Sequence, residues 1–565
     1  MHYRLSRHPH LARHFTVELR CSTEGQTTLV LQLPNWRPGR YELANYARNV
    51  VQFKATTLKG ESLQYRKISR LEWELQTEGQ QEVVVTYSYY ANQPDAGACW
   101  VDDDLFYVNP VNCLMYTTAA RYQPCRLELL LQPGEHAACG LPHENGLLLA
   151  RDFDELVDSP ILASAHLKHH AFQCEGVSYY LWFYGVNDVP WQQLENDFRA
   201  FTLPQHKMMG ELPVTAFHYL NLILPFRFYH GVEHRNSTVI ALGPSDEVFG
   251  SQYKELLGVS SHELFHTWNV KFIQPAPFKP YDYSRENYSP LGYVYEGFTT
   301  YYGDLFLYRG GVFNWESYSH EVNVYLKRHF DNYGRNNHSL HESSVDTWVD
   351  GYGGPAAPNR RVSIYAEGML NALCLDLEIR KSSANQHSLD DLMRLLYADA
   401  KDGRSYNESD LLRHLHLLTG IDFDPFFELH YRNPISLEDV LPQKLQWIGC
   451  TLETKSADDP LEAFCGVRGI DQNGKRTVTA IAPGSPAALA GLMVEDVLDL
   501  PEMPVNHEWA PGQMLTLMWH DRMLRTRTKA VTTSSGWIQR YELVRLPQVD
   551  AQQEEAFNLW STGKP

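Results

Sequence analysis

The most informative stretch of this 565-residue chain is the run Ser261-His262-Glu263-Leu264-Phe265-His266-Thr267-Trp268-Asn269. It contains the pattern HExxH. On a helix, His262 and His266 lie one turn apart on one face, a spacing at which two imidazoles can bind one small cation. Glu263 lies at the edge of that face, where its carboxylate could reach a water molecule bound to the cation. A helix with the same residues on its wet face needs no metal, so further ligands must come from elsewhere in the sequence.

A catalytic zinc ion takes three protein ligands, and the third could be His, Asp or Glu. The segment at about 291–308 predicts a second helix, and Glu296 within it is separated from His266 by 29 residues. Two helices joined by a long loop can bring a carboxylate opposite the histidines. Glu296 has Tyr295 and Phe298 beside it, where an unpaired carboxylate is costly unless a positive charge lies opposite. Glu296 is therefore the candidate third ligand, although an ordinary helix glutamate is the alternative.

Composition and charge are those of an ordinary globular protein, with 43% hydrophobic and 12% aromatic residues. The net charge is -19 and no long Lys/Arg cluster occurs, which argues against nucleic acid and anionic membrane as partners. Nine scattered cysteines without a CxxC pair indicate free thiols. The N-terminus lacks an apolar signal segment, and no window reaches the ~18 apolar residues of a membrane span. We therefore expect a cytoplasmic protein.

The pattern along the chain predicts a multidomain α+β protein. Residues 1–165 alternate apolar and polar side chains and predict an N-terminal antiparallel β domain. Residues 166–440 predict an α-rich domain that contains the candidate site, and residues 441–565 return to short strands. The helices predicted after the second candidate helix are Trp315–Phe330, Ser363–Lys381, Leu389–Ala400, Ser409–Thr419 and Pro425–His430.

Two short segments have an open interpretation. The run Trp36-Arg37-Pro38-Gly39-Arg40-Tyr41 in the β domain could be a plain turn at the end of a strand. The run His166-Leu167-Lys168-His169-His170 could bind a second metal ion. Exposed, solvated histidines are the favoured interpretation, because no carboxylate or thiol accompanies them in the sequence.

Together these motifs resemble the glycyl aminopeptidase family of gluzincin zinc metallopeptidases, whose members carry a PDZ domain. The resemblance runs along nearly the whole chain and rests on residues 33–41, 231–237, 262–271, 296–304, 363–380 and 484–492. It implies an N-terminal β domain, a thermolysin-like catalytic domain and a C-terminal PDZ-like domain. This architecture is related to that of the alanyl aminopeptidases.

The resemblance also implies roles for individual residues. His262, His266 and Glu296 would hold one zinc ion per chain, and Glu263 would be the general base that takes a proton from metal-activated water. Tyr365 matches the family position whose phenol donates to the oxyanion. A buried structural role for Tyr365 stays open, and the alternative tyrosines are Tyr301, Tyr302 and Tyr352. Two candidates share the helical face of Glu296 and could support the histidines, namely Thr300 and Asp304.

Glu233 decides the expected substrate class. The passage from Gly231 to His234 resembles the segment that binds the free α-amine of the peptide in alanyl aminopeptidases. A carboxylate fixed close to the metal favours a cationic N-terminus and leaves room for one residue before the scissile bond. Gly231 and Glu233 are therefore expected to bind substrate, and a structural glutamate is the alternative. The family implies a preference for N-terminal Gly or Ala.

The PDZ-like region departs from the family pattern. A carboxylate-binding loop needs a Gly-hydrophobic-Gly-hydrophobic sequence. The segment Trp447-Ile448-Gly449-Cys450 has tryptophan in place of the first glycine, and Glu495-Asp496 replaces a Gly-Asp pair. Peptide binding by this domain and a packing or gating role both stay open.

The sequence thus predicts a zinc-dependent aminopeptidase that acts on peptide substrates. One alternative is a zinc endopeptidase of the same fold, in which Glu233 does not bind an amine. Another is a peptide-binding PDZ protein with a vestigial metal site, which the intact set of His262, Glu263, His266 and Glu296 argues against. The sequence gives no oligomeric state.

Overall fold

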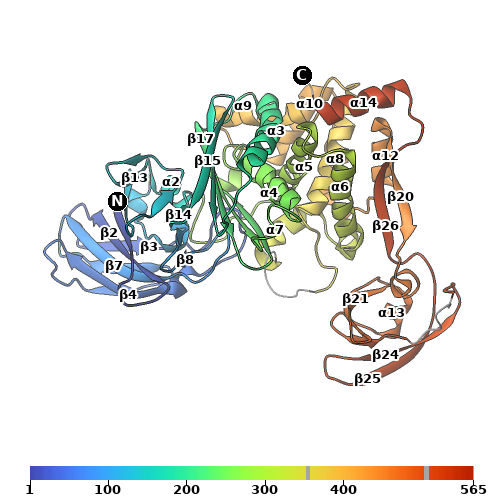
Figure 1. The fold of residues 1–565 in the computed structure, drawn as a ribbon, viewed down its shortest axis with the longest axis horizontal. Helices are drawn as coiled ribbons and strands as arrows, with labels where there is room; N and C mark the ends of the chain where they lie inside the picture. The colour runs from blue at the N-terminus through green and yellow to red at the C-terminus, as the bar shows by residue number, and fades with distance from the viewer. Residues whose placement is uncertain (351–356, 502–507, 564–565) are drawn as a thin grey trace.

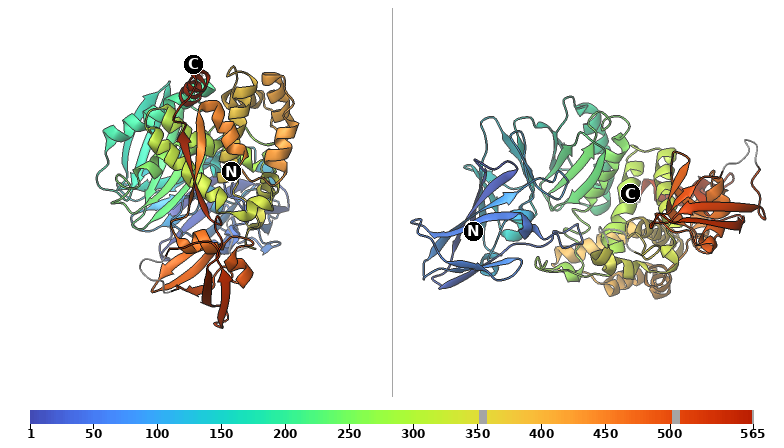
Figure 2. Two further views of the ribbon diagram at one scale, coloured as in Figure 1. Left: turned by 90° about the vertical axis from the view of Figure 1, so that its right-hand side faces the viewer. Right: turned by 90° about the horizontal axis from the view of Figure 1, so that it is seen from below.

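The computed structural model describes residues 1–350, 357–501 and 508–563. A β-rich N-terminal domain, a central domain with most of the helices and a small C-terminal module lie in a row (Figure 1). The view from below in Figure 2 gives the same order. The predicted mixed α+β organisation with a β-rich N-terminus is therefore confirmed. None of the described helices is long and apolar enough to cross a membrane.

The N-terminal domain contains three sheets, with seven, four and three strands. Their strand orders are β12-β13-β10-β1-β2-β7-β4, β11-β14-β9-β8 and β3-β6-β5. The prediction of an antiparallel domain is wrong at one pair, because β1 and β10 run parallel. A parallel pair needs a long crossover, which the strands between them provide. The elements are β1 (His2–Arg7), β2 (His14–Ser22), β3 (Thr28–Gln32), η1 (Tyr46–Asn49), β4 (Val50–Thr57), β5 (Tyr65–Lys67), β6 (Glu72–Gln76), β7 (Glu82–Tyr90), β8 (Trp100–Val101), β9 (Phe106–Val108), α1 (Pro110–Cys113), η2 (Thr118–Ala120), β10 (Cys125–Leu130), β11 (His136–Ala138), β12 (His143–Glu144), β13 (Leu147–Ala150), α2 (Phe153–Val157) and β14 (Ile161–Ser164).

The central domain packs helices against one five-stranded sheet of order β15-β16-β17-β19-β18. Strands β16, β17 and β19 are parallel, and β18 closes the edge antiparallel to β19. The elements are β15 (Lys168–Cys174), β16 (Val177–Tyr184), α3 (Trp191–Met209), β17 (Ala216–Ile223), β18 (Phe228–Glu233), β19 (Ser237–Gly243), α4 (Tyr253–Phe265), η3 (Ala276–Phe278), η4 (Tyr293–Phe298), α5 (Thr299–Arg309), α6 (Trp315–Phe330), η5 (Tyr333–Asn336), α7 (Leu340–Asp350), α8 (Ala366–Ser382), α9 (Leu389–Lys401), α10 (Glu408–Thr419), α11 (Asp424–Phe427), η6 (Glu428–Arg432), α12 (Val440–Leu445) and η7 (Gln446–Ile448).

The predicted helices are present with small shifts at their ends. The helix expected at 291–308 begins as the π-helical turn η4, which carries Glu296, and continues as α5. Helices α7 and α14 (Ala551–Thr562) were not predicted. A π-helical turn inside a helix often marks a functional position.

The C-terminal module is a five-stranded sheet inserted between the two strands of a ribbon, β20 and β26. Its own core lies under the short helix α13. The elements are β20 (Cys450–Ser456), η8 (Leu461–Cys465), β21 (Val467–Gln472), β22 (Lys475–Ile481), α13 (Pro486–Ala490), β23 (Val497–Asp499), β24 (Met514–His520), β25 (Thr526–Thr532), β26 (Gln539–Arg545) and α14.

The last helix, α14, returns to the central domain (Figure 1). Trp560 is buried in the central core, and its indole donates to the hydroxyl of Tyr301 at 2.9 Å. The segment Trp447–Cys450, the predicted counterpart of a carboxylate-binding loop, also packs on this core. We therefore propose that the C-terminal module has closer boundaries than the predicted 441–565. It consists of the part of the chain between β20 and β26.

Two glycines let the helix that carries Glu296 approach α8 closely. A Cβ atom on Gly368 would lie 2.7 Å from the Cα of Gly297, and the reverse substitution is equally tight. The two backbones therefore meet directly, one residue after Glu296.

Gly368→Ala should push α8 and η4 apart and destabilise the protein by roughly 1–3 kcal/mol, the usual cost of overpacking. Urea unfolding of the variant and the wild type measures this loss. Gly258→Ala in α4 is the matched control, because its Cβ would meet only Asp304 at an ordinary 3.6 Å. The control should be neutral or slightly stabilised, and equal midpoints for both variants would contradict the close contact.

Candidate active site

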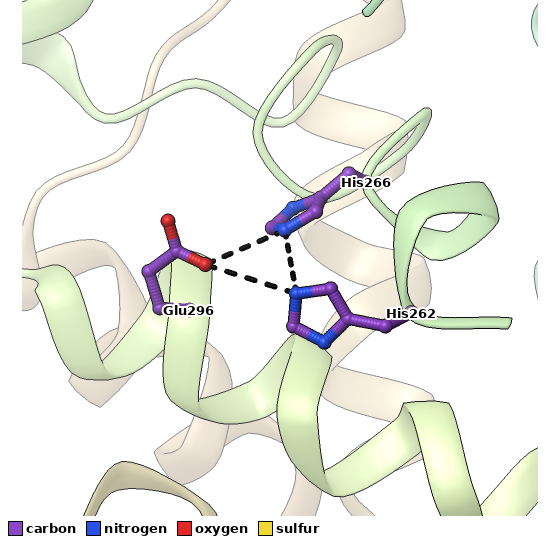
Figure 3. A group of neighbouring side chains, drawn as sticks. All are labelled: His262, His266 and Glu296. Carbon is purple, nitrogen blue, oxygen red and sulfur yellow. Dashed lines mark hydrogen bonds and ion pairs between the residues drawn. The ribbon is translucent and has the colours of Figure 1, made fainter. Parts of the chain in front are cut away.

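His262 and His266, at the C-terminal end of α4, face Glu296 in the turn η4 (Figure 3). The two Nε2 atoms are 3.0 Å apart. Glu296 Oε2 lies 3.4 Å from His266 Nε2 and 3.9 Å from His262 Nε2. Within the described ranges, this trio is one of two groups whose potential metal-binding atoms all lie within 4.8 Å of one another. The structure thus brings together the three residues that the sequence pattern selects.

Asn269 connects the two ligand-bearing segments. The Nδ1–H of His266 donates to the carbonyl of Asn269 at 2.7 Å, which leaves Nε2 directed at Glu296. The amide of Asn269 donates to the carbonyl of Val294 at 2.8 Å and to the hydroxyl of Thr299 at 3.0 Å. The carbonyl of Val294 lies in the π-helical turn, so one residue fixes the orientation of His266 and the turn that carries Glu296.

Neither of the two predicted supporting residues, Thr300 and Asp304, forms a hydrogen bond to His262 or His266 among the described residues. Thr300 donates its hydroxyl to the backbone carbonyl of Glu296 at 2.8 Å, so it stabilises the turn and not a histidine. Asp304 lines the cavity beside the site, where burial and the nearby charge of Glu321 raise its pKa to about 7. The support for His266 comes from the backbone of Asn269, which was not predicted although it lies only three positions after His266.

A second carboxylate cluster adjoins the first. Glu233, Glu263 and His266 also have side-chain atoms within 4.8 Å of one another, and all three are buried. Among the described residues, Glu233 Oε1 and Glu263 Oε2 have no hydrogen-bond partner. Three carboxylates, counting Glu296, therefore share a buried space with two imidazoles.

The proton affinities reflect this excess of acid. Burial, reinforced by the charges of Glu233 and Glu296, raises the pKa of Glu263 to about 8. Burial lowers the pKa of His262, and the neighbouring His266 lowers it further. For His266, burial acts to lower the pKa, but the hydrogen bond and charge of Glu296 outweigh it and raise the pKa to about 9. Bound cations would relieve this excess.

An open cavity of about 740 Å³ leads to the site. His262, Glu263, Gly231 and Tyr365 all line it. A side chain at position 231 would collide with the carboxylate of Glu263. Because Gly231 has no side chain, edge strand β18 can pass directly over Glu263.

Tyr365, a predicted candidate for the oxyanion role, shares a cavity with His262 and Glu263. It lines the cavity at the N-terminus of α8. The hydroxyl of Tyr301 donates to Asp376 at 2.7 Å, and that of Tyr302 donates to Asp390 at 2.8 Å, both in the buried core. Tyr352 lies outside the described residues.

The N-terminal domain contributes directly to the site. Tyr41 donates its hydroxyl to Glu296 Oε1 at 3.1 Å, and the backbone at Gly39 packs against the carboxylate of Glu233. The segment Trp36–Tyr41 is therefore more than a turn at the end of a strand. Nothing in its local sequence indicates this contact, because its partner lies 255 residues further along the chain.

Asp158, also from the N-terminal domain, joins the segments that follow Glu233 and the HExxH helix. Its Oδ1 accepts from Lys271 at 2.8 Å and lies 3.0 Å from His234 Nδ1, and its Oδ2 accepts from the backbone of Arg235 at 3.0 Å. Burial opposes ionisation, but Lys271 and His234 outweigh it and lower the pKa of Asp158 to about 2. Nothing in the local sequence around Asp158 indicates this interaction between domains, because His234 and Lys271 lie 76 and 113 residues further along the chain.

The His-rich tract forms no candidate metal site in the described part of the chain. His169 and His170 lie on β15, and His170 Nε2 is 2.6 Å from Glu195. No carboxylate lies beside the tract in the sequence. In the folded protein, however, Glu195 of helix α3 contacts His170.

Two family models match the chain. The peptidase M61 N-terminal domain matches residues 2–165, and the M61 glycyl aminopeptidase matches residues 255–371. The second range contains His262, Glu263, His266, Glu296 and Tyr365, whereas Glu233 lies between the two ranges. No curated protein matches the chain.

Among solved structures, the chain is similar to an aminopeptidase N family protein from Idiomarina loihiensis. The TM-score is 0.89 at 24% identity, and the alignment covers 99% of this chain and 100% of that chain. The two proteins therefore share one fold. A mutant M1 zinc metallopeptidase from Deinococcus radiodurans matches with a TM-score of 0.45 at 14% identity, over 77% of this chain and 94% of that chain.

Asp158→Asn should lower the free energy of unfolding by about 3 kcal/mol, because it leaves the buried charge of Lys271 without its partner. The folded-state pKa of Asp158 is below the unfolded value, so its stabilisation is present above about pH 4 and lost as the pH falls towards about 2. The difference in urea midpoint between wild type and variant should therefore shrink over that range.

Asp402→Asn is the control, because Asp402 pairs with Arg404 on the exposed surface at 2.9 Å. Surface pairs of this kind contribute about 0–1 kcal/mol. If Asp158→Asn were as mild as this control, Asp158 would not hold the two domains together.

Proposed function

The chain belongs to the M61 glycyl aminopeptidase family and is a peptidase, and from this premise we propose that it is a zinc-dependent aminopeptidase. It would remove a small N-terminal residue, Gly or Ala, from peptides. The observation that carries the proposal is the position of Glu233, whose carboxylate is buried within 4.8 Å of the facing atoms of Glu263 and His266.

His262, His266 and Glu296 would hold one zinc ion. Their facing atoms are 3.0, 3.4 and 3.9 Å apart. Ligands at about 2.1 Å from a tetrahedral zinc ion are roughly 3.4 Å apart, so the three residues fit the ion. When bound, zinc supplies Lewis-acid polarisation of the scissile carbonyl.

Glu263 would accept the proton of the attacking water and return it to the nitrogen of the leaving peptide. Its buried Oε2 has no hydrogen-bond partner among the described residues and is therefore available for this transfer. Tyr365, across the same cavity, would donate a hydrogen bond to the oxyanion.

Glu233 would bind the ammonium group of the peptide N-terminus. A charge-assisted hydrogen bond from the ammonium group would compensate the negative charge of the Glu233 carboxylate, which is costly to bury without a partner. The backbone at Gly39 in the N-terminal domain packs against the carboxylate of Glu233. The preference for a small N-terminal residue is what the family resemblance implies. The peptide would continue along edge strand β18, which has backbone groups on its outer side.

The C-terminal module would be a PDZ-like domain. Its five strands, the short helix α13 and a separate core support this proposal. The ribbon of β20 and β26 connects the module to the central domain, and the module lies away from α4 (Figure 1).

Glu263→Gln should lower kcat by roughly 10²–10⁴-fold, because the amide cannot accept the proton. Zinc content, measured by elemental analysis, should remain at one ion per chain. Glu255→Gln is the matched control on the same helix and in the same cavity, and it should keep nearly full activity. Full turnover by Glu263→Gln would remove this mechanism.

An aminopeptidase requires a free N-terminus. A peptide that starts with Gly or Ala should be cleaved, and its N-acetylated twin should not. Glu233→Gln should lower kcat/KM for the free peptide by roughly 10–100-fold, which corresponds to the loss of one hydrogen bond to a charged group. Equal rates for the free and acetylated peptides would favour the endopeptidase alternative instead.

A further inference from the structure

The loop at residues 35–41 extends from the N-terminal domain onto the central domain and is held there by hydrogen bonds. The backbone N–H of Asn35 donates to the carbonyl of Tyr283 at 2.8 Å. The indole of Trp36 donates to the carbonyl of Asp282 at 2.7 Å, and its ring is buried. The loop is thus a fixed part of the domain interface.

Tyr41 at the end of this loop contacts the predicted metal ligand Glu296. Its hydroxyl donates to Oε1 of Glu296 at 3.1 Å, and both residues are only 2% exposed. The ring of Tyr41 stacks on Phe278 at 6.2 Å and packs against Tyr295 at 5.6 Å. The enclosed ring holds the hydroxyl against the carboxylate.

This hydrogen bond distinguishes the two oxygens of Glu296. Oε1 accepts from Tyr41, and Oε2 faces His266 and His262. A carboxylate without such a bond could rotate and present either oxygen, or both, to a metal ion. A hydrogen bond to a metal ligand from outside the metal's own shell fixes that choice.

We propose that Tyr41 is a positioning residue for Glu296, so that the N-terminal domain completes the metal site of the central domain. The proposal rests on the proposed function, because it takes Glu296 as a zinc ligand. Thr300 does not duplicate this role, since its hydroxyl bonds the backbone carbonyl of Glu296 and not the carboxylate. The hydrogen bond from Tyr41 therefore reaches this predicted ligand of the central domain from the N-terminal domain.

Tyr41→Phe removes the hydroxyl and keeps the ring. The zinc affinity of the full chain, measured by competition with a chromophoric chelator, should fall by about 10–100-fold. Tyr3→Phe is the matched control, because Tyr3 is equally buried in the N-terminal domain and donates to the carbonyl of Met115 at 2.8 Å. Each variant loses one buried hydrogen bond, so both should melt at similar temperatures. The zinc affinity of the control should be unchanged.

The visible spectrum of the cobalt-substituted protein gives a second measurement, because its bands follow ligand geometry. The spectrum should change in Tyr41→Phe and stay the same in Tyr3→Phe. Wild-type zinc affinity and an unchanged cobalt spectrum in Tyr41→Phe would overturn the positioning role while the wild type still binds zinc. If Glu296→Ala binds zinc as tightly as the wild type, the proposed metal site itself fails, which is a different result.

Discussion

An excess of buried negative charge is the constraint on which this structure depends. Glu233, Glu263 and Glu296 meet beside His262 and His266 in the interior of the protein. Burial and mutual repulsion oppose the ionisation of these carboxyl groups, and they raise the pKa of Glu263 to about 8. A divalent cation held by one part of the cluster and an ammonium group held by another would compensate the charge. The residues that cost stability are therefore those that would bind metal and substrate.

The surrounding fold keeps these charges together. Gly297 and Gly368 allow α8 and η4 to pack backbone against backbone, one residue after Glu296 and three residues after Tyr365. Asn269 joins the end of the HExxH helix to the turn that carries Glu296. The N-terminal domain contributes two contacts. Tyr41 donates to Glu296, and Asp158 contacts His234, the residue after Glu233. The site is thus a product of two domains.

Much of the site could be predicted because it follows from local geometry. The four-residue spacing of His262 and His266 on a helix, and an acid on the next helix, are visible in the sequence, and the structure brings all three together. Strand alternation likewise predicted the β-rich N-terminus. Tyr41 and Asp158 could not be predicted from pattern alone, because their partners lie in another domain and no periodicity links them. The π-helical form of η4 also depends on tertiary contacts, among them the amide of Asn269.

The central claim is that one zinc ion lies between His262, His266 and Glu296, with Glu233 close enough to bind the peptide amine. A crystal of the protein grown with zinc and a Gly- or Ala-initiated substrate analogue tests it most directly, through an anomalous difference map at the zinc absorption edge. We expect one strong peak within about 2.0–2.2 Å of the three ligands and the amine of the analogue at Glu233. A peak elsewhere, or an analogue whose amine lies away from Glu233, would contradict it.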